Sequence, residues 1–143
     1  MSIVNRFADA FNRQDVDALV ACFTEDGSYD DIFFGLHAGR AKLREMFERM
    51  FREGKGYHWQ FTNVVEDARR AAGEWRFSYT VSDAIPRSAG KPVRFKGMSV
   101  FDLAGGKIAA YREYADSGVA LVQLGLAPEA LAKVFKRRVP PEA

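Results

Sequence analysis

Apolar side chains recur at helical spacing in the first part of the chain. Residues 2–13 predict one helix, which Ser2 is placed to cap, and a second, short helix begins at Asp15. Residues 40–53 predict a third helix with a continuous apolar face, which ends at the glycines of Gly54-Lys55-Gly56.

Other segments alternate apolar and polar side chains, as strands do. A short strand is predicted over residues 28–34, after a turn at residues 24–27. Beyond the third helix, the alternation predicts an antiparallel meander of strands over residues 57–66, 71–83, 93–103 and 107–114. Ala104-Gly105-Gly106 forms a tight turn between the last two strands, and a final helix covers 129–137.

This order of elements predicts an α+β fold. Three helices cannot surround four or five strands, but they can cover one face of a strongly curved sheet. We therefore expect a cone-shaped, curved antiparallel sheet packed on the N-terminal helices, with a pocket between them. We also expect one domain over residues 1–143, with a C-terminal helical extension at about 128–138.

The composition allows aromatic side chains to form the walls of such a pocket. Aromatic residues make up 13% of the chain, and 12 residues are phenylalanine. A chain of 143 residues buries a proper core, and a core this aromatic can line a cavity as well as fill one.

Charge and cysteine content exclude several classes of protein. The net charge of +2 is too small for the basic patch that nucleic-acid binding requires. Cys22 is the only cysteine, so no internal disulfide forms, and two histidines without ligand spacing predict no metal site. No stretch is apolar enough for a signal peptide or a membrane span. We expect a cytoplasmic protein with no cofactor, no nucleic-acid partner and no membrane contact.

Two segments carry a family resemblance. Residues 28–35, Ser-Tyr-Asp-Asp-Ile-Phe-Phe-Gly, follow the helical pair, and residues 106–116 begin with Gly-Lys-Ile and end in Arg-x-Tyr-x-Asp. From about Val4 to Gly118 the chain resembles the nuclear transport factor 2-like superfamily, and within it SnoaL-like proteins. The resemblance implies a conical fold, an apolar pocket in the cone and a homodimer through the outer face of the sheet. Because the superfamily includes cyclases, isomerases, hydrolases, dehydratases and non-catalytic proteins, the pocket residues must decide function.

Asp31 is the first candidate residue. In a strand, Tyr29, Asp31 and Phe33 share one face, and Asp30 points the other way. Burial disfavours the charged carboxylate, so the pKa of Asp31 should be raised, which suits a base that takes a proton from carbon or water. The alternative is an aspartate that caps a nearby turn.

Asp31 also matches the position of the general base in ketosteroid isomerases, to which the helix pair and this Asp-x-x-x-Gly stretch are similar. Phe7 stands where those enzymes have their oxyanion-hole tyrosine, and the strand around Met98 and Ser99 has no carboxylic acid. A steroid enolate would therefore be poorly stabilised.

Limonene epoxide hydrolases offer a second comparison, in which Arg76 matches their arginine and Asp116 their last-strand aspartate. Tyr29 and Asp31 match the tyrosine and asparagine that help to hold the water, and Ser78 replaces the other aspartate. This resemblance implies a partial catalytic constellation of Tyr29, Asp31, Arg76 and Asp116. The alternatives are that the polar face around Arg76 is exposed to solvent and that Asp116 caps a turn.

Further residues are expected around this constellation. Arg112, Tyr114 and Asp116 alternate along one strand and could project into the pocket together, in a network with Arg76. The expected substrate contacts are Trp59, Trp75, Tyr114, Phe33 and Met98. The alternative for Trp59 is ordinary core packing.

These residues leave two functions open. One is an enzyme that performs cofactor-free acid–base chemistry, as an isomerase, cyclase, dehydratase, lyase or hydrolase, on a small hydrophobic molecule, with Asp31 or Asp116 as the base. The other is a non-catalytic ligand-binding or dimeric interaction domain, whose carboxylates pair with Arg76 and Arg112. An enclosed pocket that holds both aspartates would favour catalysis or ligand binding.

Overall fold

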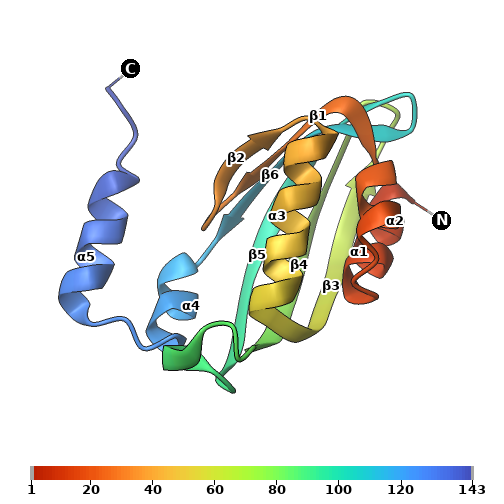
Figure 1. Cartoon of the computed structure of the whole chain (residues 1–143). Coiled ribbons are helices and arrows are strands. Elements are labelled where there is room, and N and C mark those ends of the chain that lie inside the picture. The colour runs from red at the N-terminus through yellow and green to blue at the C-terminus, as the bar shows by residue number, and fades with distance from the viewer. Residues whose placement is uncertain (1, 143) are drawn as a thin grey trace.

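The computed structural model describes residues 2–142 and confirms an α+β fold in which a curved sheet is packed on helices (Figure 1). The helices are α1 (Ile3–Asn12), α2 (Val16–Ala21), α3 (Arg40–Glu53), α4 (Ser117–Gln123) and α5 (Pro128–Arg137), with one 3-10 turn at Pro86–Ser88. The strands are β1 (Phe23–Asp31), β2 (Gly35–Ala38), β3 (Gly54–Glu66), β4 (Arg70–Val81), β5 (Pro92–Ala104) and β6 (Lys107–Ala115). Helices α1, α2 and α3 lie on one face of the sheet, and α4 and α5 follow its last strand.

The six strands form one sheet in the order β2-β1-β6-β5-β4-β3. Neighbouring strands are antiparallel except β1 and β6, which run parallel. The sheet is therefore mixed, whereas a fully antiparallel sheet was expected. The parallel pair joins two segments that are far apart in the sequence. It therefore places Tyr29 of β1 directly beside Tyr111 of β6.

The local signals at the ends of several elements are confirmed. The Ser2 hydroxyl accepts a hydrogen bond from the N–H of Asn5 at 3.1 Å, and the carboxylate of Asp15 caps α2 in the same way. Gly105 and Gly106 have φ angles of +58° and +76°, which the two-residue turn between β5 and β6 requires.

The strand expected over residues 28–34 ends at Asp31, and residues 35–38 form a further strand, β2, that was not predicted. Two turn positions also differ from the expectation. The turn predicted at residues 24–27 lies inside β1, whose pairing with β6 is irregular between Phe23 and Ser28. Helix α4 begins where a turn was predicted after Asp116, because Ala120 and Leu121 find buried positions there. Both departures arise from tertiary packing, which short-range turn signals do not record.

The core is an aromatic cluster centred on α1. Phe7 has no exposed surface and lies within 6.5 Å, measured between ring centroids, of seven other aromatic rings. Its ring fills the position that the ketosteroid isomerase comparison assigned to a polar group. The part of the cone around Phe7 is therefore filled by side chains.

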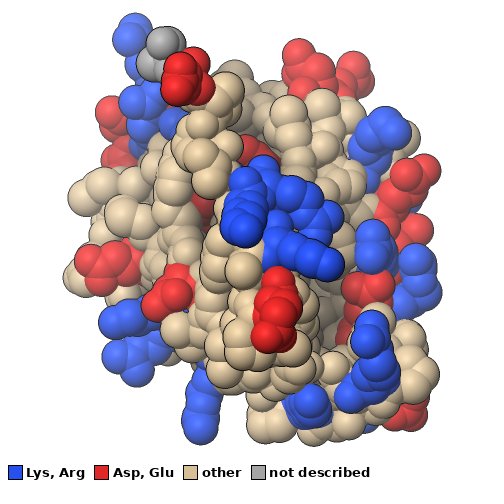
Figure 2. Space-filling model, turned by 90° about the vertical axis from the view of Figure 1, so that its left-hand side faces the viewer, with Lys and Arg blue, Asp and Glu red and all other residues tan. Residues whose placement is uncertain are grey.

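The opposite side of the molecule is formed by α5, in which no residue is fully buried. Seen from that side, Lys and Arg side chains gather in the middle of the surface (Figure 2). Among residues 2–142, no helix has the length and apolar character needed to cross a membrane.

Candidate active site

A cavity of about 1290 Å³ lies between the concave face of the sheet and the helices α3, α4 and α5. Its walls are mostly the aromatic side chains of the strands, among them Trp59, Trp75, Phe77, Tyr79 and Phe95. Three carboxyl groups also line the cavity; Glu53 is paired with Arg49, whereas Asp31 and Glu113 lie together. The structure therefore supplies a largely apolar chamber that contains a pair of acids.

Asp31 lies at the end of β1 and is only 7% exposed. Its Oδ2 atom accepts hydrogen bonds from the backbone N–H groups of Phe33 and Phe34, at 2.7 and 2.8 Å. Asp31 is thus both the turn-capping aspartate of the alternative interpretation and a buried carboxyl group in the pocket. Burial raises its pKa, and the two N–H donors oppose that rise by stabilising the charge.

Glu113 is the second carboxyl group of the site, and it was not among the predicted residues. It lies on β6, two residues after Tyr111, and Tyr111 pairs with Tyr29 of β1. The Oε1 atom of Glu113 accepts hydrogen bonds from the hydroxyls of Tyr111 at 2.6 Å and Tyr29 at 3.3 Å. Its Oε2 atom accepts one from the N–H of Ile32 at 3.2 Å.

Asp31 and Glu113 form a coupled acid pair. Burial, followed by the nearby charge of Asp31, raises the pKa of Glu113 to about 8. At neutral pH Glu113 therefore keeps its proton, beside the carboxyl group of Asp31.

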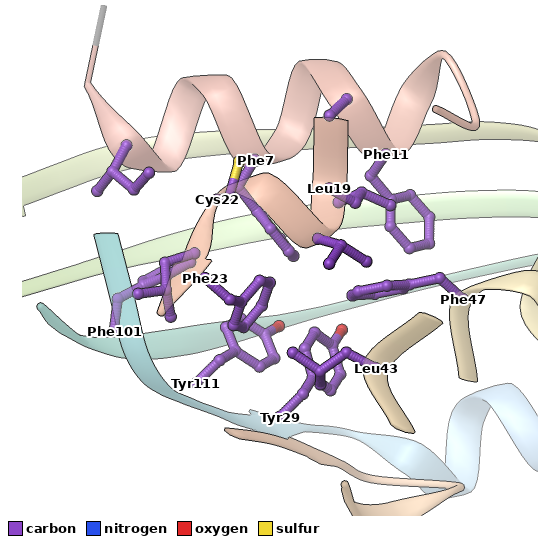
Figure 3. Packing of buried hydrophobic residues seen from close by; sticks show 14 of the residues in the cluster. Phe7, Phe11, Leu19, Cys22, Phe23, Tyr29, Leu43, Phe47, Phe101 and Tyr111 are labelled. Atoms are coloured by element: carbon purple, nitrogen blue, oxygen red, sulfur yellow. The ribbon is translucent and has the colours of Figure 1, made fainter. Parts of the chain in front are cut away.

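A chain of hydrogen bonds fixes the orientation of Glu113. The indole N–H of Trp75 can only donate, and it does so to the hydroxyl of Ser99 at 2.8 Å. Ser99 and Tyr111 are 2.7 Å apart between hydroxyl oxygens, and the hydroxyl of Tyr111 donates in turn to Glu113. The rings of Tyr29 and Tyr111 stack with their centroids 4.1 Å apart (Figure 3). Two tyrosine hydroxyls thus point at one carboxyl group.

The structure does not bring Arg76 or Asp116 to this pair, and the prediction that they point into the cone is wrong. Arg76 is exposed and lies between Trp75 and Phe77, both of which line the cavity, so it projects from the opposite face of β4. Asp116 is exposed at the start of α4 and makes no capping hydrogen bond there.

The predicted network on β6 is wrong for the same reason. Tyr114 is 62% exposed, and it faces Met98, 43% exposed, across the β5–β6 pair on the outer side of the sheet. Neither residue lines the cavity, so neither can be the substrate contact that was expected. Arg112 lies on the same outer face and forms an ion pair of 2.7 Å with Asp102.

Other predicted residues do reach the cavity. Tyr29, Asp31, Trp59, Trp75 and Phe33 all line it, although contact with a substrate stays a prediction. Trp59 is also buried in the aromatic core, which confirms the alternative of core packing for this residue. Asp30 is exposed, as its place in the alternation predicted.

One signal in the sequence identifies Glu113. Along β6, Tyr111, Glu113 and Ala115 form one face, whereas Arg112 and Tyr114 belong to the other. The first face carries fewer charges, and in a sheet with one buried side the less polar face turns inward. A lone glutamate on the apolar face of a strand is therefore the pattern that points to a buried acid.

Within residues 2–142, no group of three or more His, Cys, Asp or Glu side chains is arranged to hold a metal ion. The polar groups at the cavity floor are instead two carboxyls and two tyrosine hydroxyls. This donor set suits proton transfer.

Comparisons with known proteins agree with this fold. Residues 4–111 match the family model of the SnoaL-like domain. A candidate polyketide cyclase from Pseudomonas putida is 25% identical, with a TM-score of 0.71 over 86% of this chain and 98% of that one. No curated protein matches the sequence.

Two further solved structures share the fold. The epoxide hydrolase/cyclase-like enzyme SalBIII, which has a role in pyran ring formation in the polyether salinomycin, is 25% identical, with a TM-score of 0.69 over 81% of this chain and 89% of that one. A protein from Catenulispora acidiphila with a ketosteroid isomerase-like fold, in complex with trimethylamine, is 21% identical, with a TM-score of 0.77 over 89% and 95%.

Proposed function

Because the chain belongs to the SnoaL-like domain family, we propose that it is an enzyme in which Asp31 and Glu113 transfer protons on a small, largely apolar molecule held in the cone. Its solved neighbours include a candidate polyketide cyclase and an epoxide hydrolase/cyclase-like enzyme, which supports cyclase or hydrolase chemistry. The observation that carries the proposal is a pair of carboxyl groups inside an aromatic cavity, with Asp31 buried, Glu113 half-buried and the pKa of both raised.

The two acids have different environments and therefore different roles. Two backbone N–H groups stabilise the charged form of Asp31 and bind only Oδ2, which leaves Oδ1 to take a proton. Glu113 keeps its proton at neutral pH and can donate a hydrogen bond to a substrate oxygen on which negative charge develops. Paired acids whose environments separate their pKa values are a common basis for assigning base and acid.

The reaction proposed is a proton transfer without net oxidation or reduction. A C–H bond next to a carbonyl group breaks, its proton moves to Asp31, and the electron pair forms an enolate whose oxygen accepts the hydrogen bond from Glu113. The proton then returns from Asp31 to a carbon atom of the product. With a water molecule in place of the C–H bond, the same base and acid would serve hydrolysis.

Proton abstraction can be tested with 2-tetralone, a bicyclic ketone small enough for a cavity of about 1290 Å³. In D₂O, exchange of its C1 protons is followed by proton NMR with and without the protein. We expect the protein to catalyse exchange and the Asp31→Asn variant to lose about 100- to 10,000-fold in rate, the usual effect of removing a general base.

Asp30→Asn is the matched control, because Asp30 is the exposed neighbour of Asp31 on the same strand. This variant should exchange protons at the rate of the unchanged protein. Equal rates for the Asp31→Asn and unchanged proteins would contradict the role of Asp31. Binding of 2-tetralone without exchange would favour a ligand-binding domain.

A further inference from the structure

We infer that the natural substrate carries an anionic group, a carboxylate or one of similar charge, which is bound at the entrance of the cavity by Arg87, Arg137 and Arg138. This inference rests on the proposed function, since it names the class of molecule on which the acid pair would act. It comes from a part of the pocket that the proposed chemistry does not use.

The cavity has two zones of opposite charge. The buried carboxyl group of Asp31 and its partner Glu113 belong to the floor, formed by β1 and β6. Arg87, from the 3-10 turn after β4, and Arg137 and Arg138, from the end of α5, line the same cavity but are exposed to solvent.

The rim arginines have no acidic partner. The ion pairs found among residues 2–142 include none made by Arg87, Arg137 or Arg138. Arg49, another basic residue that lines the cavity, differs because it pairs with Glu53 at 3.0 Å.

Local contacts hold one of these arginines toward the cavity. Arg138 donates a hydrogen bond to the Ser117 hydroxyl at 2.8 Å and lies over the ring of Phe33, with 5.9 Å from the guanidinium carbon to the ring centroid. Phe33 also lines the cavity, so Arg138 sits where an apolar wall meets solvent. The only polar contact found for the Arg137 side chain in the described residues is a weak one, of 3.4 Å, to the carbonyl of Lys133 on its own helix.

This arrangement suits an amphipathic acid. The apolar body of such a molecule would lie against the aromatic walls, while its anion would remain at the rim and meet planar guanidinium groups, which bind carboxylates well. The two carboxyl groups at the floor offer no cation to a second anion, whereas the rim does. The charge pattern therefore favours a substrate that is an acid. It also favours one orientation of that substrate, in which the uncharged end lies innermost in the cavity.

The test compares two probes of the same shape, 1-naphthylacetate and the neutral 1-naphthylacetamide, whose dissociation constants for the full chain are measured by isothermal titration calorimetry. We expect the carboxylate to bind about three- to tenfold more tightly at low salt, the gain typical of a few exposed charge pairs. We also expect this preference to shrink as the ionic strength rises.

The double variant Arg87→Gln and Arg137→Gln should remove most of the preference and leave binding of the amide unchanged. The control double variant Arg52→Gln and Lys136→Gln makes the same change in net charge at exposed residues that do not line the cavity, and it should keep the preference. Equal affinity of the unchanged protein for the two probes, or binding of neither, would overturn the inference.

Failure of this inference is distinguishable from failure of the proposed function. The Asp31→Asn variant removes the base but not the rim, so it should still prefer the carboxylate probe. Loss of the preference in the rim variant, together with its retention in Asp31→Asn, would separate binding at the entrance from chemistry at the floor.

Discussion

The two ends of the cone use aromatic side chains in opposite ways. At the α1 end, Phe7 and its neighbours are packed ring against ring, and Phe7 has no exposed surface. At the α5 end, Phe33, Phe77 and Phe95 are only partly covered and enclose a cavity. The difference teaches that one end supplies the stability of the fold, whereas the other keeps the space in which Asp31 and Glu113 face a ligand.

The largest effect should come from emptying the packed end. Phe7→Ala removes a ring at the centre of the core and should lower the free energy of unfolding by about 3–5 kcal/mol, measured by urea denaturation. The matched change at the open end, Phe33→Ala, should cost about 1 kcal/mol or less because Phe33 is 37% exposed. Similar costs at the two positions would contradict the division between the ends.

The acid pair should make stability fall as pH rises. The pKa of Glu113 is about 8 in the folded protein and ordinary, about 4.3, in the unfolded chain, so between these values only the folded state holds the proton. The stability that this proton contributes is fully present below the pKa of Glu113 in the unfolded chain. It is lost as the pH rises through the pKa of Glu113 in the folded protein. The expected loss is about 1.4 kcal/mol per pH unit, or about 3 kcal/mol from pH 5 to 7.

Urea denaturation at several pH values measures this slope. Glu113→Gln should flatten it, because an amide does not titrate, while Glu48→Gln, at an exposed position of α3, should leave it unchanged. A slope in Glu113→Gln as steep as that of the unchanged protein would rule out Glu113 as its source.

A smaller effect is expected from the hydrogen-bond chain behind Glu113. Ser99→Ala leaves the buried indole N–H of Trp75 without its acceptor and Tyr111 without a partner, which should cost about 1–3 kcal/mol of unfolding free energy. Ser78→Ala, at a position with no side-chain hydrogen bond among the described residues, should be close to neutral. Equal losses of unfolding free energy in the two variants would mean that the hydrogen bonds of Ser99 contribute nothing beyond packing.

The smallest change in stability is expected from removal of α5. Because no residue of α5 is fully buried, truncation after Ala127 should alter the free energy of unfolding by less than about 1 kcal/mol. The same truncation removes Arg137 and Arg138, and should abolish the preference for 1-naphthylacetate. A truncated chain that fails to fold would show that α5 belongs to the core.

The sequence predicted the packed end better than the open one. The helices at 3–12 and 40–53 and the glycine turn at 105–106 follow local rules of periodicity and capping, and the structure confirms them. The parallel pairing of β1 with β6 is non-local, so no short-range pattern records it, and it is this pairing that brings Glu113 to Asp31.

Within the candidate site, the wrong predictions came from choosing the wrong face of a strand as the one that lines the cavity. A strand offers two faces, and choosing the wrong one moves every residue of a set together, which is why Arg76, Tyr114 and Asp116 all missed the cavity. Asp31 was found because Tyr29 and the apolar run of residues 32–34 surround it in the sequence. Glu113 was missed because the prediction turned the other face of β6, with Arg112 and Tyr114, toward the pocket.

The central claim is that Glu113 keeps a proton at neutral pH, beside Asp31 on the cavity floor. Carbon-13 NMR of side-chain carboxyl groups, with Glu113 assigned from the Glu113→Gln spectrum, measures it directly. The account predicts that Glu113 titrates near pH 8 and that its pKa falls in Asp31→Asn, where the neighbouring charge is gone. Titration of Glu113 near its ordinary value of about 4.3 would contradict it.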